Sequence, residues 1–185
     1  MSGHAPEIPV FPRLLTQPLR LLPLQPMAAA LTLVARRLIQ RHPSLIARLG
    51  GHAAARFAID PTDLPLTLLL YPHPTHTRIE LHRGVPESDA RIAGPLAALL
   101  GLVHGAYDGD ALFFSRDLVI AGDTSAALAL RNAIDDAELD LGGEIAVLAG
   151  PFRPVLLPLI EAAQRITGVA LTRADALPGG EEGLA

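Results

Sequence analysis

The sequence predicts one domain of the α/β (α+β) class, in which helices cover a five-stranded sheet. Five short segments in the middle of the chain have strand patterns, and apolar residues at helical spacing precede and follow them. At 185 residues, the chain is long enough for one core and too short for two ordinary ones. Half of the residues are hydrophobic but only 4% are aromatic, so we expect an aliphatic core.

The first 26 residues contain six prolines separated by leucines. Prolines at this density disfavour a helix, so we expect an arm that lies on an apolar surface. A helix is predicted from Pro26 to about Gln40, since proline suits the first helical position. Its apolar residues form one stripe: Met27, Leu31, Val34, Ala35 and Leu38. A shorter helix over 44–49 follows.

Five strands are predicted, over residues 53–59, 64–71, 76–82, 88–93 and 118–121. The segment 64–71 is apolar on both faces, which favours a central position in the sheet. The segment 76–82 alternates, so Thr77, Ile79 and Leu81 should face the core and the residues between them should face outward.

Three further helices are expected. The segment 95–104 is apolar almost all round, and Asp123 is expected to cap a helix over 124–139. The inward residues of that helix should be Ala126, Leu130, Ala133, Ile134 and Ala137. Residues 155–166 have a helical pattern, whereas 173–185 are small, polar and acidic and are expected to be disordered.

The composition excludes several chemistries. The chain has no cysteine, and all 15 basic residues are arginine, so thiolate chemistry and lysine Schiff bases are excluded. His73, His76 and His104 lack the spacing of a metal site, and we expect no catalytic residue, metal or cofactor. Four acids close in sequence leave open a small enzyme that uses carboxylates: Asp108, Asp110, Asp117 and Asp123.

Charge is distributed unevenly along the chain. Residues 1–56 carry seven arginines and one acid, a net charge of +6, and residues 57–185 carry eight arginines and eighteen acids, a net charge of −10. A basic, leucine-rich N-terminus indicates contact with an anionic membrane surface. The arginines expected there are Arg13, Arg20, Arg36, Arg37 and Arg41. Alternatively, the apolar arm binds a partner protein and the chain is a scaffold.

No stretch has the roughly 20 apolar residues of a spanning helix, so we expect a cytoplasmic protein at the membrane periphery.

Residues 112–135 contain a recognisable motif. Leu112-Phe113-Phe114 is followed by an Arg-x-Leu-x-Ile-x-Gly-Asp-Thr strand and turn over 116–124, and then by Arg131-Asn132 and Asp135. Residues 27 to about 140 resemble the sterol carrier protein 2 domain. More narrowly, they resemble the bacterial accessory factors of oxygen-independent (anaerobic) ubiquinone biosynthesis, the UbiT type. Asp117 departs from the pattern, because a basic residue is common there.

The resemblance implies a curved, mostly antiparallel sheet covered by helices around a hydrophobic tunnel. It also implies a non-catalytic protein that binds isoprenoid quinone precursors or phospholipids and presents them to the ring-hydroxylating proteins of the pathway. The oligomeric state, monomer or homodimer, stays open. The residues expected to line the tunnel are Leu68, Leu70, Ile79, Leu96, Leu99, Leu100, Val103, Phe113, Phe114, Leu118, Ile120, Leu130 and Ile134.

The resulting division of the chain is a basic arm over 1–26, a lipid-binding domain over 27–141, a helical extension over 142–172 and a tail over 173–185.

Overall fold

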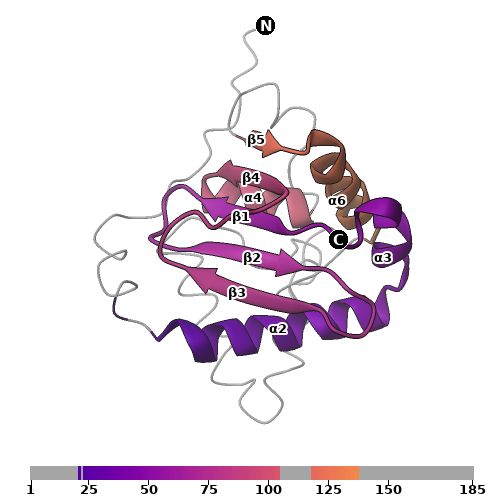
Figure 1. Cartoon of the computed structure of the whole chain (residues 1–185), viewed down its shortest axis with the longest axis horizontal. Coiled ribbons are helices and arrows are strands. Elements are labelled where there is room, and N and C mark those ends of the chain that lie inside the picture. The colour runs from indigo at the N-terminus through magenta and orange to yellow at the C-terminus, as the bar shows by residue number, and fades with distance from the viewer. Residues whose placement is uncertain (1–20, 22, 105–117, 138–185) are drawn as a thin grey trace, which may run out of the picture.

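A computed structural model of the chain describes residues 21, 23–104 and 118–137. Its central feature is a five-stranded sheet with the order β3-β2-β1-β4-β5 (Figure 1). The strands are β1 (Phe57–Pro61), β2 (Thr67–Tyr71), β3 (Arg78–His82), β4 (Ala90–Gly94) and β5 (Val119–Gly122). β1 and β4 are parallel, and the other neighbouring strands are antiparallel. The predicted α/β class and mostly antiparallel five-stranded sheet are confirmed.

The central strand is β1, whereas we expected the segment 64–71 there. β2 is an inner strand with a neighbour on each side, but it begins only at Thr67. The three residues before it belong to the connection from β1, where the N–H of Leu64 donates to the carbonyl of Pro61 at 3.0 Å. The hydrophobicity of 64–71 therefore reflects the partial burial of this connection as well as the burial of the strand.

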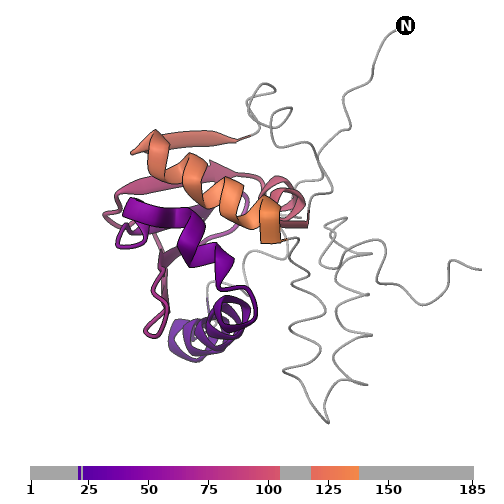
Figure 2. The ribbon, with the colours of Figure 1, turned by 90° about the vertical axis from the view of Figure 1, so that its right-hand side faces the viewer.

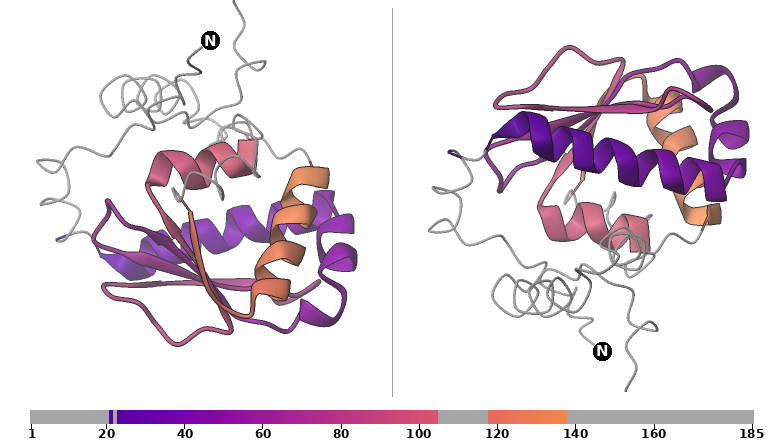
Figure 3. Two further views of the ribbon diagram at one scale, coloured as in Figure 1. Left: turned by 90° about the horizontal axis from the view of Figure 1, so that it is seen from above. Right: turned by 90° about the horizontal axis from the view of Figure 1, so that it is seen from below.

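The sheet is covered by helices on one face (Figures 2 and 3). They are α2 (Leu24–Arg41), α3 (Ser44–Leu49), α4 (Leu96–His104) and α6 (Thr124–Ala137), with a short 3-10 turn, η1 (Gly50–His52), after α3. α2 begins two residues before Pro26, the predicted start. Proline fits there because the N–H groups of a helix's first turn have no intrahelical acceptor.

α2 lies along β3, the edge strand of the sheet (Figure 1). The hydroxyl of Thr32 donates to the carbonyl of Ile79 at 3.2 Å and accepts from its N–H at 3.0 Å. Nε of Arg36 donates to the carbonyl of Thr77 at 2.9 Å. These bonds satisfy backbone groups that an open sheet edge would leave unpaired. Thr77, Ile79 and Leu81 are buried, as predicted.

The turn between β5 and α6 is built by Gly122 and Asp123. Gly122 has φ +81°, and a Cβ there would lie 2.4 Å from the carbonyl oxygen of Asp89. The N–H of Asp123 donates to that same oxygen at 2.8 Å. Oδ1 of Asp123 accepts from the N–H groups of Ser125 at 2.9 Å and of Ala126 at 3.1 Å, which confirms the predicted N-cap.

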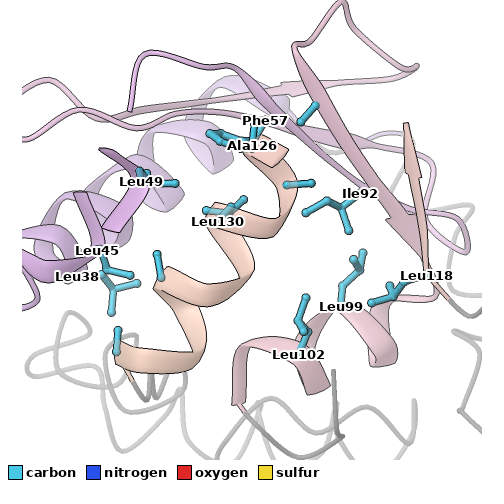
Figure 4. Packing of buried hydrophobic residues seen from close by; sticks show 14 of the residues in the cluster. Leu38, Leu45, Leu49, Phe57, Ile92, Leu99, Leu102, Leu118, Ala126 and Leu130 are labelled. Atoms are coloured by element: carbon cyan, nitrogen blue, oxygen red, sulfur yellow. The ribbon is translucent and has the colours of Figure 1, made fainter. Parts of the chain in front are cut away.

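The core lies between the sheet and the helices (Figure 4). Phe57 of β1 is fully buried there, together with Ile92 of β4. The buried face of α6 is rich in alanine, which lets this helix pack closely against α3. The predicted inward residues of α6 are buried, except that Ile134 is half-buried: Ala126, Leu130, Ala133, Ile134 and Ala137.

Candidate functional site

An apolar cavity of about 390 Å³ lies between the inner face of the sheet and the helices. This volume is at the lower end of the range for small-molecule sites, roughly 300–1,000 Å³. Its lining side chains are all hydrophobic: Met27, Leu31, Ala35, Leu38, Ile39, Leu45, Ile46, Leu49, Ile59, Pro61, Leu64, Leu66, Leu68, Leu70, Pro72, Leu81, Leu96, Leu99, Leu100, Leu130, Ala133 and Ile134. The side chains of this described lining offer a ligand no hydrogen bond.

Each element contributes to this cavity according to its periodicity. Leu68 and Leu70 project from the inner face of β2, because alternate residues of a strand share a face. α4 contributes Leu96, Leu99 and Leu100, which lie at helical spacing. Branched aliphatic side chains dominate the described lining, which contains no aromatic side chain.

The structure brings part of the predicted tunnel lining together. The predicted residues that line the cavity are Leu68, Leu70, Leu96, Leu99, Leu100, Leu130 and Ile134. Ile79 is buried on β3 and Leu118 is buried in the core, while Ile120 packs half-buried against that core, and none of them lines the cavity. Val103 belongs to α4, but its side chain lies outside the description, as do Phe113 and Phe114.

The lining residues of α2 and α3 were not predicted from the sequence. Leu31, Ala35 and Leu38 of α2 and Leu45 and Ile46 of α3 all face the cavity. The available signal was the apolar stripe of the first helix, which we interpreted only as a packing face. The stripe lines the cavity as well as packing against the core.

The arginines expected at a membrane are placed only in part. Arg13 and Arg20 lie outside the described residues. Arg36 and Arg41 are exposed on α2, and Arg37 is half-buried on the same helix. Within the described part of the chain, no helix is long and apolar enough to cross a membrane.

Of the four acids considered as candidates for catalysis, only Asp123 lies among the described residues. Asp108, Asp110 and Asp117 lie outside them. Hydrogen bonds from the hydroxyl of Ser125 and the N–H of Ala126 lower the pKa of the Asp123 carboxyl. Asp123 is therefore a charged helix cap at neutral pH, which is the wrong state for a general acid.

His73 and His76 have a local structural role, and the side chain of His104 lies outside the description. Nδ1 of His73 accepts from the N–H groups of Thr75 at 3.2 Å and of His76 at 3.1 Å in the turn between β2 and β3. Among residues 21, 23–104 and 118–137, no group of three or more histidines and acids is placed to hold a metal ion.

Comparison with known proteins identifies the family. The sequence profile of the SCP-2 sterol transfer family matches residues 35–135, more than half of the chain. No curated protein sequence is similar enough to align with this chain.

Among solved structures, a UbiJ-SCP2 ubiquinone synthesis protein has a TM-score of 0.50 and 17% identity, covering 64% of this chain and 98% of its own. Sterol carrier protein 2 from Yarrowia lipolytica has a TM-score of 0.43 and 14% identity, covering 60% of this chain and 92% of its own. The sterol carrier protein domain 2 of Helicoverpa armigera has a TM-score of 0.43 and 13% identity, covering 75% of this chain and 95% of its own. The family match, with an apolar cavity under its helices, shows that the chain belongs to the SCP-2 sterol transfer family and has its lipid-binding fold.

Proposed function

We propose that this protein is a non-catalytic accessory factor that binds an isoprenoid quinone precursor or another membrane lipid and presents it to enzymes of ubiquinone biosynthesis. The observation that carries the proposal is the cavity, whose lining is entirely hydrophobic. Transfer of apolar surface from water contributes about 25 cal/mol per Å², so a tail that buries roughly 200 Å² gains about 5 kcal/mol. That is enough to hold a lipid and little enough to release it.

The assignment to ubiquinone biosynthesis has two supports. The motif over 112–135 resembles the accessory factors of the oxygen-independent pathway. The chain also shares its fold with a ubiquinone synthesis protein. In this role the partners are the proteins that hydroxylate the quinone ring, and the protein works on the cytoplasmic side of an anionic membrane without a resident cofactor.

The chemistry of the described site supports a non-catalytic role. Among the described residues that line the cavity, no side chain can donate or accept a proton. The chemistry would then belong to the enzyme that receives the lipid, and the carrier would keep a hydrophobic substrate available to it.

The proposal is tested by filling the cavity from one side. Ala35 lies on α2 and lines the cavity, whereas Ala30 is exposed on the same helix and does not. Ala35→Phe should occupy part of the volume and reduce bound lipid, and Ala30→Phe is the matched control. The full chain is purified from a bacterium that makes ubiquinone, and extracted lipids are measured by mass spectrometry.

We expect lipid in the wild type and in Ala30→Phe and much less in Ala35→Phe, with both variants folded. An overpacked site costs typically 1–3 kcal/mol, so thermal unfolding is measured alongside. If the wild-type protein carries no lipid but co-purifies with a partner protein in stoichiometric amount, the lipid-carrier hypothesis is refuted and the scaffold hypothesis is favoured.

A further inference from the structure

The apolar cavity extends along α2. Met27, near the start of this helix, and Ile39, twelve positions later, both line it. An α-helix rises about 1.5 Å per residue, so these two positions lie about 18 Å apart along the helix axis. β2 gives a similar length, because Leu66 and Pro72 also line the cavity and six steps of an extended chain span about 20 Å.

These two lengths measure the same axis. The hydroxyl of Thr32 and then the guanidinium of Arg36 bond to successively earlier residues of β3, so α2 and β3 run in opposite directions (Figure 1). β2 is antiparallel to β3, and therefore α2 and β2 run in the same direction. The start of α2 lies at the same end of the cavity as the start of β2, and the cavity is roughly 18–20 Å long along both elements.

The width of the cavity is that of one aliphatic chain. A volume of about 390 Å³ over a length of about 20 Å corresponds to a mean cross-section of about 20 Å². Packed aliphatic chains have carbon atoms about 4–4.5 Å apart, so each chain occupies about 16–20 Å². Two chains side by side, or the fused rings of a sterol, need a wider cavity than this.

The volume also limits how much of a chain can enter. At about 30 Å³ for each group of the size of a water molecule, 390 Å³ holds about 13 carbon atoms. The length is sufficient for this number, because an extended chain advances about 1.2 Å per bond and 18–20 Å takes about 15 bonds. Volume is therefore the stricter limit, and it corresponds to nearly three isoprene units of five carbons each.

We propose that the cavity encloses a single aliphatic chain of about 15 carbons, three isoprene units, and that the further units of a longer polyprenyl tail lie outside it. This inference rests on the proposed lipid-binding function and adds which part of a ligand the cavity selects. Affinity depends on tail length up to three units and not beyond, and a chain is preferred to a sterol. A carrier of this kind can hold part of a long tail while the remaining units stay in a bilayer.

The test uses one head and tails of different length. Binding to the full chain is measured by calorimetry with prenyl ethers that carry one to four isoprene units on the same neutral oligo(ethylene glycol) head, each below its micelle concentration. We expect affinity to rise at least about tenfold with each unit up to three, since each buried methylene contributes about fourfold. The fourth unit should change the affinity by less than about threefold, because its carbons stay in water. The cholesteryl ether of the same head should bind at least about tenfold more weakly than the three-unit ether.

Two variants change the volume. Ala133 is buried and lines the cavity, whereas Ala47 is exposed on α3 and does not line it. Ala133→Leu adds three carbons to the wall, so the three-unit ether should bind at least about tenfold more weakly while the two-unit ether keeps its affinity. Ala47→Leu is the matched control and should bind every ether as the wild type does. Ile46→Ala removes three carbons from the lining, so in this variant the four-unit ether should bind more tightly than the three-unit ether.

Three results would overturn these inferences, and they are distinguishable. If the fourth unit raises the affinity of the wild type as much as the third, the length limit is wrong and the carrier remains. If the cholesteryl ether binds as tightly as the three-unit ether, the single-chain width is wrong. If the wild type binds none of the ethers, the proposed function itself is refuted.

Discussion

Replacing Gly122 by alanine should destabilise the protein more than the same replacement at Gly50, Gly51 or Gly84. A side chain at φ +81° costs roughly 1–2 kcal/mol, because it occupies the left-handed region. The added Cβ would also lie 2.4 Å from the carbonyl oxygen of Asp89, so the backbone has to move. That movement strains the 2.8 Å hydrogen bond from the N–H of Asp123 to the same oxygen.

The magnitude follows from adding these effects. Gly122, Asp123 and Asp89 are exposed, so loss of this hydrogen bond costs about 0.5–1.5 kcal/mol. Together with the backbone penalty, Gly122→Ala should reduce the free energy of unfolding by roughly 1.5–3.5 kcal/mol. For a chain of this length, each kcal/mol lowers the Tm by about 2–4 °C, so we expect a drop of roughly 3–14 °C.

The assay is urea and thermal unfolding followed by far-UV circular dichroism. Gly84 provides the control, because a Cβ there meets nothing within 4 Å and its φ is not positive. Gly84→Ala should change stability by less than about 1 kcal/mol and is expected to stabilise slightly, since alanine restricts the unfolded chain. If the two variants unfold at the same temperature, the close approach of Gly122 to Asp89 has no energetic weight and the reasoning fails.

Two further predictions concern charge. Hydrogen bonds from Ser125 and Ala126 lower the pKa of the Asp123 carboxyl in the folded protein. The ionised carboxylate should therefore stabilise the fold above its unfolded pKa of about 3.9. This stabilisation should be lost as the pH falls through the lower folded pKa. Asp123→Asn keeps a capping oxygen without the charge, so urea midpoints of the two proteins should converge below pH 4, and a constant difference from pH 7 to 3 would contradict the assignment. Binding to liposomes should rise with anionic lipid and fall with salt, and deletion of residues 1–22, which removes Arg13 and Arg20, should weaken it. If equal amounts of protein sediment with neutral and with anionic liposomes, the predicted role of the basic N-terminus in membrane binding is wrong.

Local chemistry made several elements predictable. Asp123 was identifiable as a cap because a short acidic residue directly before an apolar helical pattern satisfies free N–H groups. The alternation over 76–82 identified the inward side of β3, since a strand that packs on only one face repeats every two residues. These features depend on neighbours in sequence, and the structure agrees with them.

Long-range packing was not predictable in the same way. Nothing in 57–61 indicates that this strand pairs in parallel with β4, because that choice depends on the course of the chain between them. Leu118 and Ile120 were assigned to the tunnel from hydrophobicity alone, which cannot distinguish a core contact from a cavity wall. The hollow between α2 and the β2–β3 turn was not predicted either, because these two elements meet only in the fold.

The position of α2 limits what its leucines can do at a membrane. A leucine-rich helix next to arginines suggests an amphipathic segment that lies in a bilayer interface. In the folded protein, however, Leu31 faces the cavity and Leu38 is buried in the core. These side chains cannot also insert into lipid unless the helix leaves β3, which would expose the edge that Thr32 and Arg36 now cover. If the folded domain contacts a membrane, the outer side of α2 would have to make that contact, because the apolar stripe lines the cavity and packs in the core.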